Sequence, residues 1–321
     1  MGSYCQKSMP NDEDSNQPPR QPLTAAVLLK QDDRTSESVI KLLHGNGTFK
    51  ALSGSEGKDI IKRDAEDETK LAVGIQIAVA KGVLEASPNV SPVRKIDVVG
   101  KTADAVAQEI LAQLPGKEGN IVILQGLSGT GKGTTVQKLQ QLLPKCVCWS
   151  NGNVFRSLTW MANDHCAKHK LEFGSQVLTA DLVKSFVRRM EFKQFGEVFD
   201  VVLDGKVRVS EIQNTELKAP LISSRVPTVA EQTQGEVVLF AAAAVETLRS
   251  HGHNVILEGR AQTLNYIPSK YRFELCIPDP AVLGERRAAQ RVVAKAAQSI
   301  KPDSTVAQVE EAVIAAVHAL S

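Results

Sequence analysis

Gly126-Leu127-Ser128-Gly129-Thr130-Gly131-Lys132-Gly133-Thr134-Thr135 is the most informative segment of the chain. It follows an apolar run at residues 121–124, typical of a strand covered on both faces, and leads into a helical pattern at residues 134–143. Glycines between a buried strand and a helix let consecutive backbone amides turn inward and form a nest for an anion. The start of the helix adds the positive end of its dipole. The segment therefore predicts a loop that binds the phosphates of a nucleotide.

Within this loop, Lys132 is expected to reach the outer phosphates as a point charge. The usual P-loop places Ser or Thr directly after the lysine, whereas here Gly133 intervenes, so Thr134 becomes the candidate magnesium ligand. Ser128 and Thr135 are further candidates for that role. The alternative for the segment is a glycine-rich turn without a ligand. The predicted nucleotide-binding residues are Gly126, Ser128, Gly129, Thr130, Gly131, Lys132, Gly133, Thr134 and Thr135.

The part of the chain from residue 120 onward alternates strand-like and helical patterns. Apolar runs at 255–257 and 273–277 are separated by helical patterns, notably at 226–250 and 280–297. This alternation predicts a parallel sheet flanked by helices. The expected fold is α/β, a P-loop NTPase-type parallel sheet flanked by helices, with a P-loop domain over residues 117–321.

The residues before this domain predict a disordered tail at 1–22 and a small α/β accessory region at 23–116 whose role the sequence does not indicate. Thr102 is a candidate helix N-cap. The glutamates and lysines between residues 58 and 70 are expected to form a solvated face. The elements predicted in the accessory region are a strand at 23–29, a helix at 36–44, a glycine-rich loop or hairpin at 45–57, a helix at 69–85, a strand at 96–99 and a helix at 102–114.

Composition excludes several classes of protein. The 321 residues contain 38 Lys and Arg against 36 Asp and Glu, a net charge of +2, which is too balanced for a dedicated nucleic-acid or membrane-surface protein. Aromatic residues make up only 4%, which argues against a stacking platform for single strands. No run approaches the ~18 apolar residues of a membrane span. We therefore expect neither a nucleic-acid nor a membrane partner.

The five cysteines are odd in number and irregularly spaced, which favours reduced thiols and a cytoplasmic protein over a disulfide framework. A zinc site is the alternative reading of some of them. The spacing of the candidate ligands matches none of the usual zinc patterns. These candidates are Cys146, Cys148, His165, Cys166 and His169.

The order Gly-Lys-Gly-Thr at residues 131–134 resembles the nucleoside monophosphate kinases, and within them the cytidylate kinases most. Residues 151–156, Asn-Gly-Asn-Val-Phe-Arg, resemble the family segment Ser-Gly-Ala-hydrophobic-Tyr-Arg. Residues 207–212 resemble a strand and turn of the acceptor-binding region. Residues 255–260 resemble a strand that ends in Gly-Arg-Asp, and 285–291 resemble the helix that leads to the lid. The resemblance covers about residues 120–320.

This resemblance implies that Arg156 and Arg260 hold the phosphate of the acceptor. The chemistry agrees, because arginine offers a planar, permanently charged fork for phosphate oxygens. Arg260 also lies just past the end of a strand, where open α/β sheets bind ligands. An ordinary surface ion pair is the alternative for both arginines. The implied catalytic residues are Lys132, Arg156 and Arg260, the implied metal residues are Thr134 and Glu258, and the implied acceptor-binding residues are Asn151, Gly152, Arg156, Ser210 and Arg260.

The chain departs from the family pattern at two positions implied to read cytosine. Ala261 stands where the family has Asp, and Gln213 stands where it has Arg, so the choice of base stays open. The arginine-rich lid is expected after Arg291, yet residues 292–299 are largely small and apolar and no arginine follows. Basic residues on the preceding helix are candidates to replace the lid arginines, and a solvated helix face is the alternative for its arginines. These residues are Arg286, Arg287, Arg291 and Lys295.

The resemblance implies ATP-dependent phosphoryl transfer to a nucleoside monophosphate, with CMP or dCMP as the expected acceptor and ATP and Mg²⁺ as cofactors. Two alternatives remain open. The first is a nucleotide-binding regulatory module with weak or no catalysis, which the missing lid favours. The second is a small-molecule P-loop kinase with a non-nucleotide acceptor. The oligomeric state is not indicated.

Overall fold

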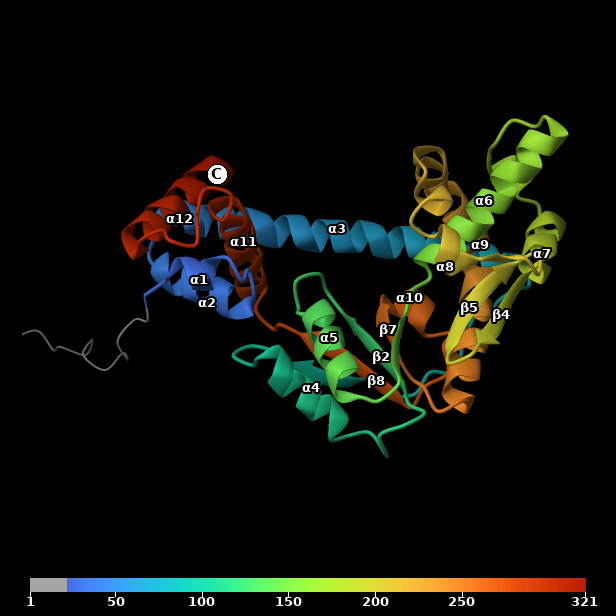
Figure 1. Ribbon diagram of the computed structural model, residues 1–321, viewed down its shortest axis with the longest axis horizontal. Helices are drawn as coiled ribbons and strands as arrows, with labels where there is room; N and C mark the ends of the chain where they lie inside the picture. The colour runs from blue at the N-terminus through green and yellow to red at the C-terminus, as the bar shows by residue number, and fades with distance from the viewer. Residues whose placement is uncertain (1–21) are drawn as a thin grey trace, which may run out of the picture. The chain divides into compact units, whose positions relative to one another are not determined.

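The computed structural model describes residues 22–321, which fall into two compact units (Figure 1). The first unit comprises residues 22–52 and 288–321, and the second comprises residues 53–287. Except for Pro22, the predicted tail lies outside the described residues. These units divide the chain differently from the expected boundary at residue 117, since strand and helix residues on both sides of it belong to the second unit.

A five-stranded sheet forms the centre of the second unit, and every neighbouring pair of its strands is parallel. An α/β fold with a parallel sheet flanked by helices is therefore confirmed. In spatial order the strands are β1 (Arg94–Asp97), β8 (Tyr271–Cys276), β2 (Ile121–Gly126), β7 (Asn254–Gly259) and β3 (Cys146–Trp149).

Alternate residues of the central strands pack against helices on opposite faces of the sheet. Val122 and Leu124 of β2 pack with the apolar faces of α4 (Ala103–Leu111) and α5 (Lys132–Leu142). Ile121 and Ile123 pack with α9 (Pro220–Ser250), whose Val238, Ala241 and Val245 are buried there. Burial on both faces explains why β2 is a continuous apolar run rather than an alternating one.

The register of the sheet brings two loops to one edge. Leu124 of β2 is paired with Glu258 of β7, and Gln125 with Gly259. Because parallel strands end at the same edge, the glycine-rich loop after β2 and the residues after β7 leave the sheet side by side. The short helix α10 (Ala261–Leu264) follows β7 directly.

A second, antiparallel sheet in this unit joins β4 (Met190–Phe195), β5 (Val198–Leu203) and β6 (Val207–Arg208). Its buried residues share a core with α6 (Gly152–His169) and α7 (Ala180–Arg188). The short helix α8 (Val209–Ile212) follows β6. Two 3₁₀ turns complete this part, at Ser175–Val177 and Glu216–Lys218.

The first unit is helical and has its own apolar core. It contains α1 (Ala25–Leu28), α2 (Asp33–Leu42), the start of α3 (Gly47–Ala80), the end of α11 (Pro280–Ala296) and α12 (Val306–Leu320). Capping boxes begin α2, at Asp32 and Thr35, and α12, at Thr305 and Gln308. The apolar residues after Arg291 belong to this core, in which Val292, Val293 and Ala296 are buried.

Two predictions for the accessory region are wrong. Residues 23–29 contain helix α1 rather than a strand, and residues 47–57 belong to α3 rather than to a loop or hairpin. Gly57 of this stretch serves close packing instead of a turn. A Cβ at Gly57 would lie 3.4 Å from the Cα atom of Gly284 in α11, and a Cβ at Gly284 would lie 2.2 Å from the carbonyl oxygen of Ser53. The two helices approach this closely only without side chains there.

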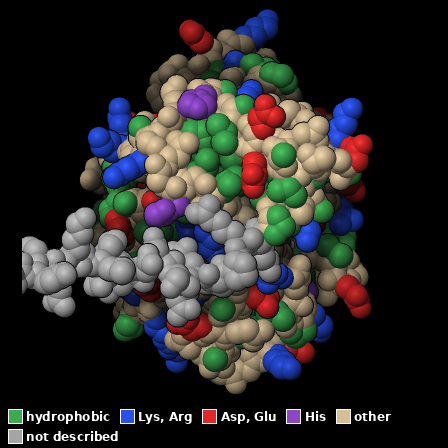
Figure 2. Space-filling view, turned by 90° about the vertical axis from the view of Figure 1, so that its left-hand side faces the viewer, with side chains coloured by type: hydrophobic (Ala, Val, Ile, Leu, Met, Phe, Trp, Pro, Cys, Tyr) green, Lys and Arg blue, Asp and Glu red, His purple; other side chains and the backbone are tan. Residues whose placement is uncertain are grey.

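Other predictions for this region are confirmed. A helix forms near 36–44, the strand near 96–99 is β1, and Thr102 caps α4 by accepting a hydrogen bond from the amide of Ala105. β1 is the edge strand beside β8, so part of the accessory region completes the central sheet. Within residues 22–321, no helix combines the length and apolarity that a membrane crossing requires. On the face displayed in Figure 2, basic and acidic side chains are interspersed.

Candidate functional site

The loop between β2 and α5 has a positive φ at three glycines, of which Gly129 has a φ of +86°. Gly126 has a φ of +144°, and a Cβ there would lie 2.5 Å from the carbonyl oxygen of Leu275. Gly131, the N-cap of α5, has a φ of +83° in the left-handed region. These conformations turn the chain sharply from strand to helix. The first amides of α5, at Lys132, Gly133 and Thr134, consequently have no acceptor within their own helix.

Lys132 reaches back over the loop from the start of α5. Its Nζ donates hydrogen bonds to the carbonyl oxygens of Gly126, at 2.9 Å, and Leu127, at 2.8 Å. Burial, followed by the positive charge of Arg260, lowers the pKa of Lys132 to about 8. The ammonium group is thus held against the loop and is mostly charged at neutral pH.

The hydroxyl residues of the loop are engaged locally. Thr130 Oγ1 donates to the carbonyl oxygen of Leu127 at 2.8 Å, and Thr134 Oγ1 donates to that of Gly131 at 2.9 Å. Thr135 is buried beneath the helix start. The metal-ligand candidates of the loop are Ser128, Thr134 and Thr135. The hydroxyl of Ser128 is bonded to Asp64 and Thr135 is buried, whereas the Thr134 hydroxyl is bonded to one loop carbonyl.

A carboxylate from α3 lies against this loop, and no sequence motif pointed to it. Asp64 Oδ2 accepts a hydrogen bond from the amide of Ser128 at 2.7 Å, and Asp64 Oδ1 accepts one from the Ser128 hydroxyl at 2.7 Å. The Asp64 side chain is only 2% exposed. Asp64 lies among the glutamates and lysines of residues 58–70, which are predicted to form a solvated face. Because Asp64 itself is buried, it does not belong to that face.

Arg260 connects the end of β7 to the same loop. Its Nη2 lies 2.5 Å from Asp64 Oδ1 and 3.1 Å from Ser128 Oγ, and its Nη1 donates to the carbonyl oxygen of Gly126 at 2.5 Å. The side chain is 16% exposed. Arg260 therefore does form an ion pair, but a largely buried one at the loop rather than an ordinary surface pair.

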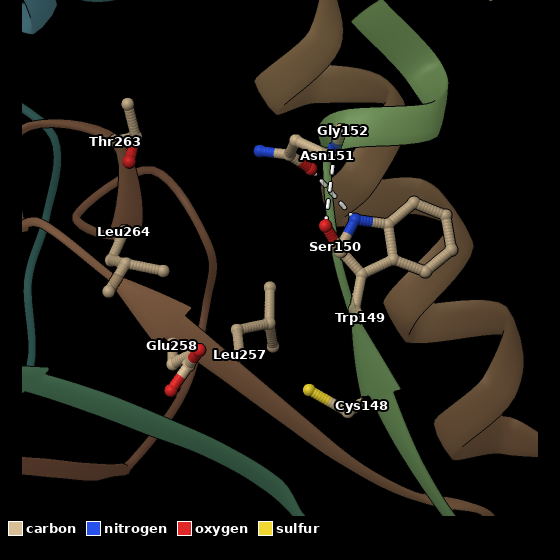
Figure 3. A pocket seen from close by; sticks show the side chains of 9 residues that line it. All are labelled: Cys148, Trp149, Ser150, Asn151, Gly152, Leu257, Glu258, Thr263 and Leu264. Carbon is tan, nitrogen blue, oxygen red and sulfur yellow. Dashed lines mark hydrogen bonds between the residues drawn. The ribbon is translucent and has the colours of Figure 1, made fainter. Parts of the chain in front are cut away.

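Beside the loop, a cavity of about 300 Å³ opens between the ends of β3 and β7. Figure 3 shows residues from β3 and the start of α6 on one side of it and residues from β7 and α10 on the other. Three predicted site residues, Asn151, Gly152 and Glu258, line it. Asn151 Oδ1 accepts a hydrogen bond from Trp149 Nε1 at 2.8 Å, which fixes the amide at the rim.

Arg156 lies one helical turn after Gly152 on α6. A Cβ at Gly152 would lie 3.0 Å from Arg156 Nη1, so the glycine leaves room for the guanidinium. Arg156 Nε is buried and has no hydrogen-bond partner among residues 22–321. An unsatisfied buried donor costs about 1–3 kcal/mol, more for a charged group, so a free guanidinium here is suited to an anionic ligand.

Glu258 is exposed at the cavity. Its negative charge acts on the loop, because it raises the pKa of Lys132, whereas burial lowers that pKa. Within residues 22–321, no cluster of three or more His, Cys, Asp or Glu residues is arranged to hold a metal. A magnesium ion bound near Thr134 and Glu258 would thus take further oxygens from phosphates, as this ion commonly does.

Ser210 is placed differently from the residues above. Its hydroxyl donates to Asp200 Oδ2 at 2.5 Å, and Ser210 is not among the described residues that line the cavity. Asp200 also pairs with Arg208 Nε at 3.1 Å, so this carboxylate ties β5 to β6 and α8. Gln213, which departs from the family pattern, accepts a hydrogen bond from Asn153 Nδ2 at 2.8 Å.

The four cysteines described are free. Burial raises the pKa of the Cys146 thiol to about 12, and burial together with Glu258 raises that of Cys148, which lines the cavity. Neither thiol is a nucleophile at neutral pH.

No protein-family model matches the chain, and no curated protein matches it in sequence.

Proposed function

We propose that the protein is a P-loop kinase that transfers a phosphoryl group from ATP to a nucleoside monophosphate, with CMP or dCMP as the expected acceptor. One observation carries the proposal. The glycine-rich loop with Lys132, to which Arg260 is hydrogen-bonded, and the cavity with Gly152 and Glu258 lie at the same edge of a parallel sheet. Open α/β sheets bind their ligands at this edge.

The residues of the loop suit the phosphates of ATP. The first amides of α5 and the helix dipole favour negative charge, and Lys132 adds a positive charge held against the loop. Thr134 and Glu258 would hold Mg²⁺, which, when bound, neutralises charge on the phosphate oxygens. Phosphoryl transfer requires positioning and charge neutralisation rather than a covalent protein intermediate. Lys132 and Arg260 supply positive charge for that purpose.

The cavity suits the acceptor. Its volume of about 300 Å³ lies at the lower end of the range for small-molecule sites. Arg156, with its unpartnered Nε, would bind the acceptor phosphate, and Asn151 and Gly152 would border it. The amides of Asn153 and Gln213 bond to each other where the family would read cytosine, so a base other than cytosine remains an outcome of the test.

The proposal is tested by measuring ADP release with ATP, Mg²⁺ and a panel of CMP, dCMP, UMP, AMP and GMP. We expect acceptor-dependent release that Lys132→Ala reduces by at least about 100-fold, because Lys132 faces the phosphates. The matched control is Lys138→Ala, on the same helix with a side chain 42% exposed, which should leave the rate unchanged. Absence of release with every acceptor would refute the nucleoside monophosphate kinase.

A second candidate function is a nucleotide-binding regulatory module with weak or no catalysis. The buried contact of Asp64 with Ser128 and Arg260 favours it, as does the burial of residues after Arg291 in a separate core instead of a lid. ATP binding without phosphoryl transfer to any acceptor would support this module. Transfer to a non-nucleotide small molecule is the third outcome. In each case we propose a cytoplasmic protein, which the free cysteines support.

A further inference from the structure

The carboxylate of Asp64 engages Ser128, a predicted nucleotide-binding residue of the loop, and Arg260, whose positive charge the proposed function gives to phosphates. Its two oxygens take the amide and hydroxyl of Ser128 and the guanidinium of Arg260, at 2.5–2.7 Å. All three residues belong to the second unit. Charge-assisted bonds of this length are the ones that carboxylate and phosphate oxygens form with such donors. One carboxylate therefore occupies donors on both the loop and the acceptor side.

Two residues on one face of α3, Ile60 and Asp64, lie against the loop, so the contact is more than one side chain reaching over. Glu56, Ile60 and Asp64 are buried and lie four residues apart, which places them on one face of the helix. Ile60 Cδ1 lies 3.9 Å from the position of a Cβ on Gly129. Ile60 thus sits over Gly129 and Asp64 sits over Ser128. By contrast, Lys62 and Arg63, which precede Asp64, are exposed.

We propose that Asp64 is an internal competitor for the phosphate site, and that ATP binds only when this carboxylate leaves Ser128 and Arg260. The inference rests on the proposed binding of ATP at the loop. A buried carboxylate and a phosphate group cannot share the same donors, and their like charges repel most strongly where water is excluded. While α3 is docked, the loop amide of Ser128 and the guanidinium of Arg260 are withheld from ligands.

The experiment measures the dissociation constant of Mg²⁺–ATP by titration calorimetry for the full chain and for Asp64→Asn. The amide keeps the size of the side chain but removes its charge. We expect the variant to bind ATP at least tenfold more tightly. The matched control is Asp59→Asn, the same change at an exposed position of the same helix, which should leave the affinity within twofold.

A second measurement needs no variant. Hydrogen exchange of the wild-type chain is followed over residues 58–68 with and without saturating Mg²⁺–ATP. We expect faster exchange in this segment when ATP is bound, because the helix loses its anchor. A purely structural role of Asp64 predicts unchanged or slower exchange, and that result would overturn the proposal.

The outcomes separate this inference from the function on which it rests. If the wild type binds ATP and Asp64→Asn binds it no more tightly, the competitor role is refuted and the nucleotide site stands. If neither protein binds ATP, the nucleotide site is refuted and the competitor role with it. Tighter binding by Asp64→Asn, with no change for Asp59→Asn, supports both.

Discussion

Gly152 and Arg156 are fitted to each other at the start of α6, where a Cβ at position 152 would lie 3.0 Å from Arg156 Nη1. Any side chain at 152 must displace the guanidinium of Arg156 from its place beside Gly152. We therefore expect Gly152→Ala to raise the KM for the acceptor by about three- to tenfold while the KM for ATP stays the same. Steady-state kinetics with each substrate varied in turn measures this. Gly116→Ala, at a glycine with open space around it, is the control, and equal effects on both substrates would contradict the assignment.

The pKa of Lys132 predicts how ATP affinity depends on pH. Burial lowers this pKa to about 8, so the free protein holds a charged ammonium below pH 8 and loses the charge above it. Phosphate binding favours the charged form. The affinity for ATP is thus constant below pH 8 and falls by up to about tenfold per pH unit above it.

Titration calorimetry between pH 6.5 and 9.5 checks this dependence. Lys132→Arg should flatten the profile, because arginine stays charged over the whole range. A wild-type profile that is flat through pH 9 would show that Lys132 carries no charge relevant to ATP.

Arg260 and Asp64 form a buried ion pair, so we expect the effects of substituting them on the free energy of unfolding to be non-additive. Arg260→Gln leaves a carboxylate that is 2% exposed without its counter-charge, and should lower the free energy of unfolding by about 3 kcal/mol. Adding Asp64→Asn should restore at least about 1 kcal/mol of that loss. Urea unfolding of the wild type, both single variants and the double variant measures the coupling.

The control for this cycle is the pair of Arg249 and Glu246, whose side chains are 46% and 56% exposed. Exposed pairs contribute little, so Arg249→Gln should change the stability by less than about 1 kcal/mol. Additive effects of Arg260→Gln and Asp64→Asn would mean that the two charges do not interact appreciably in solution.

The helix glycines Gly284 and Gly54 should respond in opposite directions to alanine. A Cβ at Gly284 would lie 2.2 Å from the carbonyl oxygen of Ser53, so Gly284→Ala should destabilise the protein by about 1–3 kcal/mol. Gly54 lies in α3 with open space around it, so Gly54→Ala should stabilise it by about 0.5–1 kcal/mol through helix propensity. Thermal unfolding compares the two, and a neutral Gly284→Ala would show that α3 and α11 are not packed this closely.

Local pattern was sufficient to predict the glycine-rich loop and four of the five strands of the central sheet, but not β3. Continuous apolar runs at β2, β7 and β8 are what strands buried on both faces require, and the glycine positions match the backbone at Gly126 and Gly131. Parallel strands also end together, which placed Glu258 and Arg260 beside the loop before any contact was known. These features follow from neighbours in sequence or from the geometry of a parallel sheet.

Contacts between distant segments were not predictable in this way. The glycines of residues 47–57 look like turn formers, yet they lie in α3, and among them Gly57 packs closely against α11. The apolar residues after Arg291 carry no lid pattern, and the core of the first unit shows why.

The sequence by itself determined four strands of the sheet, the glycine-rich loop and the charged groups at the end of β7, because each depends on local backbone preference and on the burial of apolar runs. Only the tertiary structure decided that Asp64, one carboxylate among many in a charged helix, is buried against Ser128 and Arg260. Nothing in its immediate neighbourhood distinguishes it. The packing of α3 sets its environment. Asp64 accepts a hydrogen bond from the amide of Ser128, which lies 64 residues away in sequence.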